Sequence, residues 1–351
     1  MAQKKRKLKI KATFSKKRII AGAIVFALII ASMPFYAFFQ NVLSTERRWK
    51  DNGAGLAVTF IDVGQNDAAF IRLPNGSNML IISGGDVSKR AAGNFRSALS
   101  NRVKGNEKII NHVVFSHNFR MPGASVNHIF GNYKVENFYF GAAAIGFVNF
   151  ALDSDAFVHM PVMNEVSIYN SDGLIVVLFA PAVLDVDDDN NSVIVYIKYK
   201  DRGFLFMGGA KEAQEKWLVE NYGNQIENTT VLKLAQHGDN NASRMDFLNA
   251  VQPGFAIIST SGRNGFPHPA VINRLNLLDK KPRVLRTDRR GNISLFVSNR
   301  SVSKTASGVG VRTQKGTPGV NWFVLCSAAM VLGFIGIFAV RIGFEKNKKS
   351  P

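Results

Sequence analysis

Apolar residues give way abruptly to a polar turn in residues 113–124, which read Val-Val-Phe-Ser-His-Asn-Phe-Arg-Met-Pro-Gly-Ala. The apolar start, residues 113–115, is typical of a buried strand, and the turn after it predicts a loop at the carboxyl end of that strand. This edge of the sheet is where α/β folds place their ligands. His117, in that loop, is therefore a candidate site residue, with an ordinary polar loop histidine as the alternative.

Short apolar runs separated by Gly, Asn and Pro recur on both sides of this stretch. The expected strands cover residues 56–61, 68–73, 79–82, 135–139, 174–179, 193–198, 204–207, 231–234, 255–258, 284–286 and 293–297, and the expected helices cover residues 89–100, 211–221, 245–251 and 270–278. Residues 141–170 show no clear pattern. Strand-rich halves with interspersed helices predict an α/β sandwich with helices on its outer faces.

Both ends of the chain carry an apolar stretch flanked by basic residues. Residues 19–39 are uncharged and follow a tail, residues 1–18, with nine Lys or Arg and no acid. A helix over this range, rising about 1.5 Å per residue, can cross a bilayer core of about 30 Å. Residues 320–342 form a second expected span before a basic tail, residues 343–351. A cleaved signal peptide is the alternative for residues 19–39, although the apolar run is long for one.

The placement of basic residues outside both spans predicts the topology. By the positive-inside rule, both termini lie in the cytosol and the part between the spans is extracytoplasmic, so the protein is expected in the cell membrane. The basic tails also suit anionic lipid headgroups. Residues 40–55 and the Ser-, Thr- and Gly-rich residues 298–319 are expected to be linkers. Cys326, the only cysteine, lies in the second span, which excludes a disulfide framework and a Cys-based zinc site.

Six pieces of sequence, taken in order, resemble the metallo-β-lactamase-like domain of the ComEC competence proteins. The first is VTFIDVGQNDAAFI at residues 58–71, where the family has FxDVGQGDA, and the second is LPNG at residues 73–76, which matches the family's hairpin. Asn191-Ser192-Val193 corresponds to the family's N-x-S motif, and Gln236-His237-Gly238-Asp239 corresponds to HHGS. Asn264 with His268-Pro269 corresponds to N…HP, and residues 286–291 correspond to RTD…G. The resemblance covers about residues 56–297. It implies a four-layer αββα sandwich over those residues.

Most of the family's metal-binding pieces are replaced in this chain. The family's Asp-Gly-Gly motif is Ser-Gly-Gly here, at residues 83–85, and of its HxHxDH motif only His117 is kept over residues 117–122. The family's Gly-Asp pair is Gly208-Gly209 in this chain, and the double histidine of HHGS is reduced to His237. A hydrolytic zinc site needs about three His or carboxylate ligands and one open position for water. Arg120 adds a positive charge that opposes a cation. We therefore expect no cofactor and no metal-dependent hydrolysis.

The residues that remain are candidates for individual roles. His117 and His237 are weak candidates for metal ligands and, with Asp288, for catalysis. The candidates for ligand binding are His268, Asn191, Asp62 and Arg120.

Each candidate also has a structural interpretation. His268, before Pro269, is expected to cap or order a loop, and Asp62, Asp67 and Asp288 to hold turns by accepting backbone N–H groups. The acidic residues 185–189 predict a solvated loop; a calcium loop is the alternative, although the glycine and distal glutamate of an EF-hand are absent.

Two functions follow from the resemblance. The preferred one is a membrane-anchored binding or scaffolding module that has lost hydrolysis and is linked to DNA uptake. Its expected partners are DNA or another anionic polymer, and a polytopic membrane channel protein, because the family couples such a domain to a channel. The alternative is a divergent hydrolase, phosphodiesterase- or nuclease-like, that uses zinc or manganese in a rearranged site with His117, His237, His268 and a carboxylate.

Overall fold

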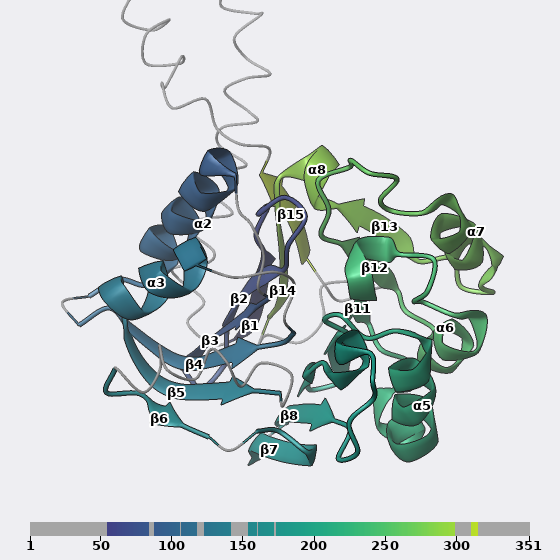
Figure 1. The fold of residues 1–351 in the computed structure, drawn as a ribbon, viewed down its shortest axis with the longest axis horizontal. Helices are drawn as coiled ribbons and strands as arrows, with labels where there is room; N and C mark the ends of the chain where they lie inside the picture. The colour runs from purple at the N-terminus through teal and green to yellow at the C-terminus, as the bar shows by residue number, and fades with distance from the viewer. Residues whose placement is uncertain are drawn as a thin grey trace, which may run out of the picture. The chain divides into compact units, whose positions relative to one another are not determined.

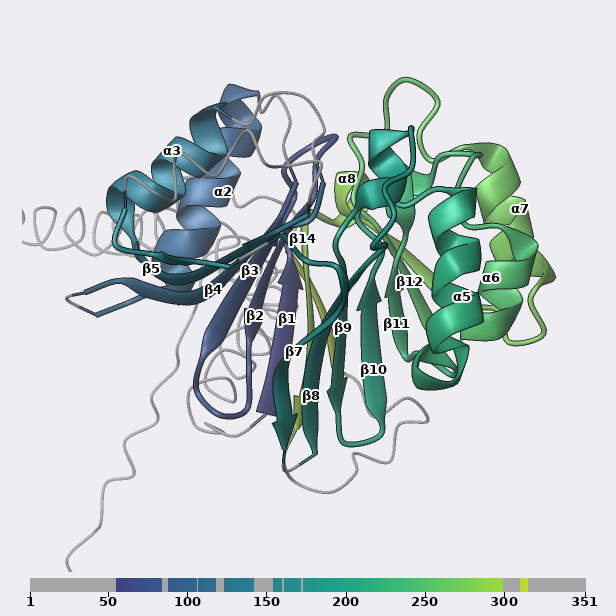
Figure 2. The ribbon, with the colours of Figure 1, turned by 60° about the horizontal axis from the view of Figure 1, so that its bottom comes forward.

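Two β-sheets face each other in the computed structural model, and helices cover the outer face of each sheet (Figures 1 and 2). The structure describes residues 55–83, 88–105, 107–117, 123–141, 154–159, 161–171, 173–298 and 310–314. This mixed α/β arrangement with two sheets confirms the fold class expected between the two apolar stretches.

The first sheet has the strand order β15-β14-β1-β2-β3-β4-β5-β6. Its strands are β1 (Gly55–Phe60), β2 (Ala68–Arg72), β3 (Asn78–Ile82), β4 (Ile109–Phe115), β5 (Lys134–Phe140), β6 (Phe157–Val158), β14 (Asn292–Ser298) and β15 (Gly310–Gln314). Strands β3 to β6 pair in parallel, so their carboxyl ends lie at the same edge.

The second sheet has the order β13-β12-β11-β10-β9-β8-β7. Its strands are β7 (Asn164–Ser171), β8 (Leu174–Ala180), β9 (Ile194–Tyr199), β10 (Arg202–Phe206), β11 (Val231–Lys233), β12 (Phe255–Ile258) and β13 (Arg283–Arg286). Strands β10 to β13 pair in parallel, which gives this sheet a second edge of carboxyl ends.

Helices form the outer layers. The helices are α2 (Lys89–Arg102) and α3 (Gly123–Asn132) on the first sheet, and α5 (Glu212–Ile226), α6 (Met245–Val251) and α7 (Pro269–Leu277) on the second. Three shorter turns of helix are η2 (Asp188–Asn191), η3 (Ala235–Gly238) and α8 (Thr287–Arg290). One apolar core lies between the sheets, where the rings of Phe60 and Phe206 stack with centroids 5.6 Å apart. Two further cores join each sheet to its helices.

The expected strands and helices between residues 56 and 297 are present, whereas strands β6, β7 and β15 and helix α3 were not expected. Strand β7 lies at a sheet edge and is largely exposed, so residues 164–171 carry no apolar run that would have revealed it. Residues 310–314, inside the stretch predicted to be a linker, instead form β15, because they pair with β14 along the edge of the first sheet.

The expected membrane spans, residues 19–39 and 320–342, and the two basic tails lie outside the described residues. Among the helices that the structure does describe, none combines the length and the apolar character needed to cross a bilayer.

Helix α6 begins on a buried carboxylate from a neighbouring helix. The N-cap residue Arg244 offers no side-chain cap. Instead, the backbone N–H groups of Ser243 and Arg244 donate to Glu215 of α5, at 2.5 and 3.0 Å. Burial raises the pKa of Glu215 from 4.5 to about 7, although these two hydrogen bonds act in the opposite direction.

This raised pKa predicts how stability changes with pH. Between pH 4.5 and about 7 the folded protein keeps a proton on Glu215 that the unfolded chain releases, so the free energy of unfolding falls as the pH rises. We expect Glu215→Gln to remove this part of the pH dependence in urea unfolding. Glu212→Gln, on the exposed side of the same helix, is the matched control and should keep it. Identical profiles for Glu215→Gln and the wild type would contradict this interpretation.

Candidate functional site

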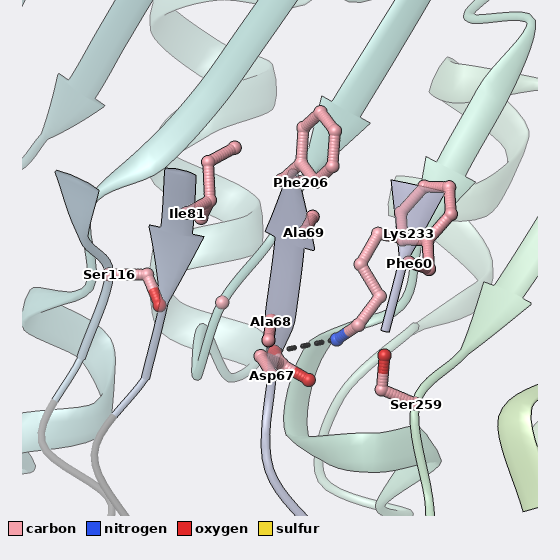
Figure 3. Close-up of a pocket in the computed structure, with 10 residues that line it drawn as sticks. Phe60, Asp67, Ala68, Ala69, Ile81, Ser116, Phe206, Lys233 and Ser259 are labelled. Carbon is pink, nitrogen blue, oxygen red and sulfur yellow. Dashed lines mark hydrogen bonds and ion pairs between the residues drawn. The ribbon is translucent and has the colours of Figure 1, made fainter. Parts of the chain in front are cut away.

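The carboxyl ends of the parallel strands meet at one small pocket between the sheets. The pocket has a volume of about 10 Å³, room for about one water molecule. Figure 3 shows its polar side chains, Asp67, Ser116, Lys233 and Ser259, which come from both sheets or the loops next to them. His117 follows β4 and His237 lies in η3, after β11, so the two remaining candidate histidines come from the two facing sheets.

A buried ion pair crosses the pocket from one sheet to the other. The Nζ atom of Lys233, at the end of β11, lies 2.7 Å from Oδ2 of Asp67, which precedes β2 (Figure 3). Lys233 also donates to the carbonyl oxygen of Leu234 at 2.7 Å, and the Asp67 backbone N–H donates to Ser83 Oγ at 2.9 Å. The two side chains are only 4% and 9% exposed.

The surroundings of Asp67 keep it ionised. Burial alone would raise the pKa of this carboxyl group, but the Lys233 ammonium and the His237 ring outweigh burial and hold the pKa well below its usual value. The expectation that Asp67 only holds a turn was therefore wrong. The sequence signal for the ion pair was Lys233 itself, a charged residue inside the apolar strand β11, and it was overlooked.

His237 lies in a backbone conformation that few residues adopt. It is 1% exposed, and both it and Gln236 have left-handed φ angles, 56° and 47°. Nδ1 of His237 donates to the carbonyl oxygen of Ser259 at 3.0 Å. The same atom lies 3.5 Å from Oδ1 of Asp67.

His117 packs directly on the glycine pair after β10. A Cβ atom added at Gly209 would lie 2.7 Å from Cδ2 of the His117 ring, so the ring fills the space that a side chain there would need. Nδ1 of His117 shares a 2.9 Å hydrogen bond with Ser116 Oγ, and the buried Nε2 has no partner among the described residues. Burial lowers the pKa of His117 to about 4, which keeps the ring neutral.

Two positions that depart from the ComEC pattern are bonded to each other. Gln236 replaces the first histidine of HHGS, and Gly209 replaces the aspartate of Gly-Asp. The Gln236 side-chain amide donates to the Gly209 carbonyl oxygen at 2.6 Å, and the Gln236 backbone N–H donates to Gly208 at 3.1 Å. Gln236 and Gly209, which stand at these positions in this chain, thus join the loops after β10 and β11.

The residues that the structure describes do not fit a hydrolytic zinc or manganese centre. In the described part of the chain, no group of three or more His, Cys, Asp or Glu side chains is placed to hold a metal ion. Two histidines remain, but one oxygen of Asp67 is engaged by an ammonium group and Gly209 offers no donor side chain. A dication beside Lys233 would also meet a like charge in a low-dielectric pocket.

The other candidates do not line this pocket, and they hold local structure. His268 caps α7, because its Nδ1 accepts the Ala270 N–H at 3.2 Å, as predicted. Asp288 binds Arg286 through both oxygens, at 3.0 and 2.7 Å. These side chains therefore order turns at the rim of the fold.

Asp62 and Asn191 also have local partners. Asp62 pairs with Arg90 of α2 at 3.0 Å and accepts the Gly64 N–H at 3.4 Å. Asn191 closes the acidic loop by two hydrogen bonds with the Asp185 backbone, at 2.8 and 2.9 Å. Arg120 lies outside the described residues.

Comparison with known proteins identifies two competence proteins as relatives. No protein-family model matches the chain. It is 35% identical to the competence protein ComA of Neisseria gonorrhoeae over 109 residues, which are 30% of this chain and 15% of ComA. It is 23% identical to the ComE operon protein 3 of Bacillus subtilis (strain 168) over 306 residues, 81% of this chain and 37% of that protein. The chain thus spans well under half the length of either relative.

Solved structures with similar arrangements are more distant. A mutant of the CmlA beta-hydroxylase matches with a TM-score of 0.41 and 13% identity, over 68% of this chain and 53% of that one. A long-form RNase Z from yeast matches with a TM-score of 0.44 and 8% identity, over 76% and 50%. Because these scores are low, the fold assignment rests on the sheets themselves.

The described part of the chain has the architecture of a metallo-β-lactamase-like domain. Two mixed sheets face each other, helices lie outside them, and a pocket lies at the carboxyl ends of the parallel strands. The chain's ordered motifs and its similarity to two competence proteins support the predicted resemblance to the metallo-β-lactamase-like domain of the ComEC family.

Removal of one partner of the buried ion pair should destabilise the fold strongly. Lys233→Met leaves Asp67 ionised, buried and unpaired, and we expect the free energy of unfolding to fall by about 3–5 kcal/mol. Urea unfolding measures this change. The matched control is Lys216→Met, which removes an exposed pair with Glu220 and should cost at most about 1 kcal/mol. Equal costs for the two variants would show that the buried pair has no special role.

The contact between His117 and Gly209 can be tested by a double-mutant cycle. Gly209→Ala places a methyl group against the His117 ring and should destabilise the protein by about 1–3 kcal/mol. In a His117→Ala background, Gly209→Ala should lower the free energy of unfolding much less, because the His117 ring is no longer there. Gly93→Ala, in an open position of α2, should be neutral or stabilising. Additive effects at 117 and 209 would contradict the contact.

Proposed function

We propose that this protein is a membrane-anchored, externally facing ComEC-type module that binds or scaffolds without metal-dependent hydrolysis and is linked to DNA uptake. The observation that carries the proposal is the hydrogen bond between Gln236 and Gly209, two positions where the family has metal-binding residues. Together with the Lys233–Asp67 pair, it supports a pocket held by internal contacts in place of a metal.

The membrane part of the proposal rests on the ends of the chain. Residues 19–39 are uncharged, residues 320–342 are uncharged as far as residue 340, and both have the length and composition of spans, while their basic outer flanks favour cytosolic termini. The similarity to two competence proteins supports a link to competence. The partners we propose are anionic lipid at the tails, DNA or another anionic polymer at the domain, and a polytopic channel protein.

One observation favours the alternative, a divergent metal-dependent hydrolase. Nε2 of His117 is buried with no partner among the described residues, and a neutral ring nitrogen is a good ligand for zinc or manganese. On this alternative, His117 and His237 provide two ligands of the metal, in a site rearranged from the family's pattern.

Metal content and DNA binding of the full chain in detergent separate the two functions. For the proposed module we expect less than about 0.1 equivalent of zinc or manganese, no phosphodiesterase activity, and DNA binding that weakens at least about tenfold between low and physiological salt. About one equivalent of metal that is lost in His117→Ala and His237→Ala, with turnover of a phosphate ester, would establish the hydrolase. DNA affinity that does not change with salt would reject the binding role.

A further inference from the structure

Four segments around the mouth of the pocket are bonded into one surface. The loop between β1 and β2 is tied to α2, since Arg90 pairs with Asp62 at 3.0 Å, and to the start of β14, since the Asp62 N–H donates to Asn292 Oδ1 at 2.8 Å. The same loop is tied to the loop after β12, because Gln65 Oε1 accepts the Ser261 N–H at 3.1 Å. These segments continue directly from pocket residues Asp67 and Ser259.

The loop after β12 also packs on α8. A Cβ atom at Gly262 would collide with the Asp288 carboxylate, so the two segments are in contact. The start of α2, the loop after β12 and α8 therefore form one continuous face.

This face carries exposed positive charge. Its five basic residues, which we call the basic rim, are Lys89, Arg90, Arg263, Arg289 and Arg290, and all are exposed. The two acidic side chains described beside them, Asp62 and Asp288, are already engaged by Arg90 and Arg286. No described acidic side chain pairs with the other four members of the rim, so their charge is open to an external anion.

We propose that the basic rim is the surface on which a DNA backbone lies, an inference that rests on the proposed function and names where that binding occurs. Four of the five residues are arginines, whose planar guanidinium groups donate two parallel hydrogen bonds to a phosphate. The start of α2, the loop after β12 and α8 spread these charges over a broad face, which suits successive phosphates of a polymer. Contacts of this kind are independent of base sequence and weaken steeply with salt.

Charge reversal at α8 tests the rim. The probe is a fluorescein-labelled duplex of about 20 base pairs, with the full chain in an uncharged detergent and affinity measured across salt concentrations. We expect Arg289→Glu with Arg290→Glu to weaken binding at least about tenfold at low salt and to reduce the slope of log affinity against log salt by about 1.8, since each lost phosphate contact removes about 0.9. Arg263→Glu, in the neighbouring loop, should weaken binding in the same direction and serves as a second variant if the first unfolds.

The matched control reverses two charges at the other end of the same strand. Lys280→Glu with Lys281→Glu precedes β13, whereas α8 follows it, and both lysines are exposed. This control should bind DNA within about threefold of the wild type. If the folded α8 and Arg263 variants bind DNA as tightly as the control, the proposal that DNA binds at the basic rim is wrong, whereas the proposed DNA-binding function is not affected. If the wild type binds anionic vesicles but no DNA, both the rim and the proposed DNA-binding role are overturned.

Discussion

A single buried ion pair, between Asp67 and Lys233, joins the two sheets at the point where the pocket forms. Buried charges lose the hydration they have in water, and only close geometry with additional hydrogen bonds compensates for that loss. Lys233 meets this requirement through a second hydrogen bond to the Leu234 carbonyl oxygen, and the backbone of Asp67 is held in place by its N–H bond to Ser83. The loop that carries Asp67 is thereby fixed against β11, and His237, which follows β11, is fixed beside it.

The loops around this pair are held by contacts between positions that differ from the ComEC pattern. An aspartate at position 209 could not coexist with the observed His117 ring, because even its Cβ atom would collide with the ring. Gln236, in place of a histidine, bonds the Gly209 carbonyl oxygen and so uses the space beside that glycine. The differences are mutually consistent, which is the behaviour expected of a close-packed interior where each change in volume must be matched by its neighbours.

The fold could be predicted from the sequence because its signals are local. Apolar runs and turns marked nearly every strand between residues 56 and 297, and the order of motifs supplied the arrangement that periodicity alone could not. The cap that His268 provides for α7 also depends only on neighbouring residues. Strand β7 was missed because an exposed edge strand needs no apolar face.

The ion pair could not be predicted in the same way. Its partners are 166 positions apart, and each looks ordinary in its own segment: an aspartate in a turn and a lysine in a short strand. Only the meeting of the two sheets brings them together. A charged residue in an otherwise apolar strand such as β11 is nevertheless informative, because burying it requires a partner elsewhere in the chain.

Charge is distributed differently inside the pocket and around it. Inside, Lys233 and Asp67 neutralise each other and His117 is uncharged, so the interior offers little net attraction to an anion. Outside, four members of the basic rim are exposed and have no acidic partner among the described residues. On the proposed function, an anionic polymer is therefore attracted to the mouth and has no electrostatic reason to enter the pocket. On this proposal the contacts that stabilise the pocket and the charges that attract a ligand belong to different residues, so binding at the rim would not require a metal in the pocket.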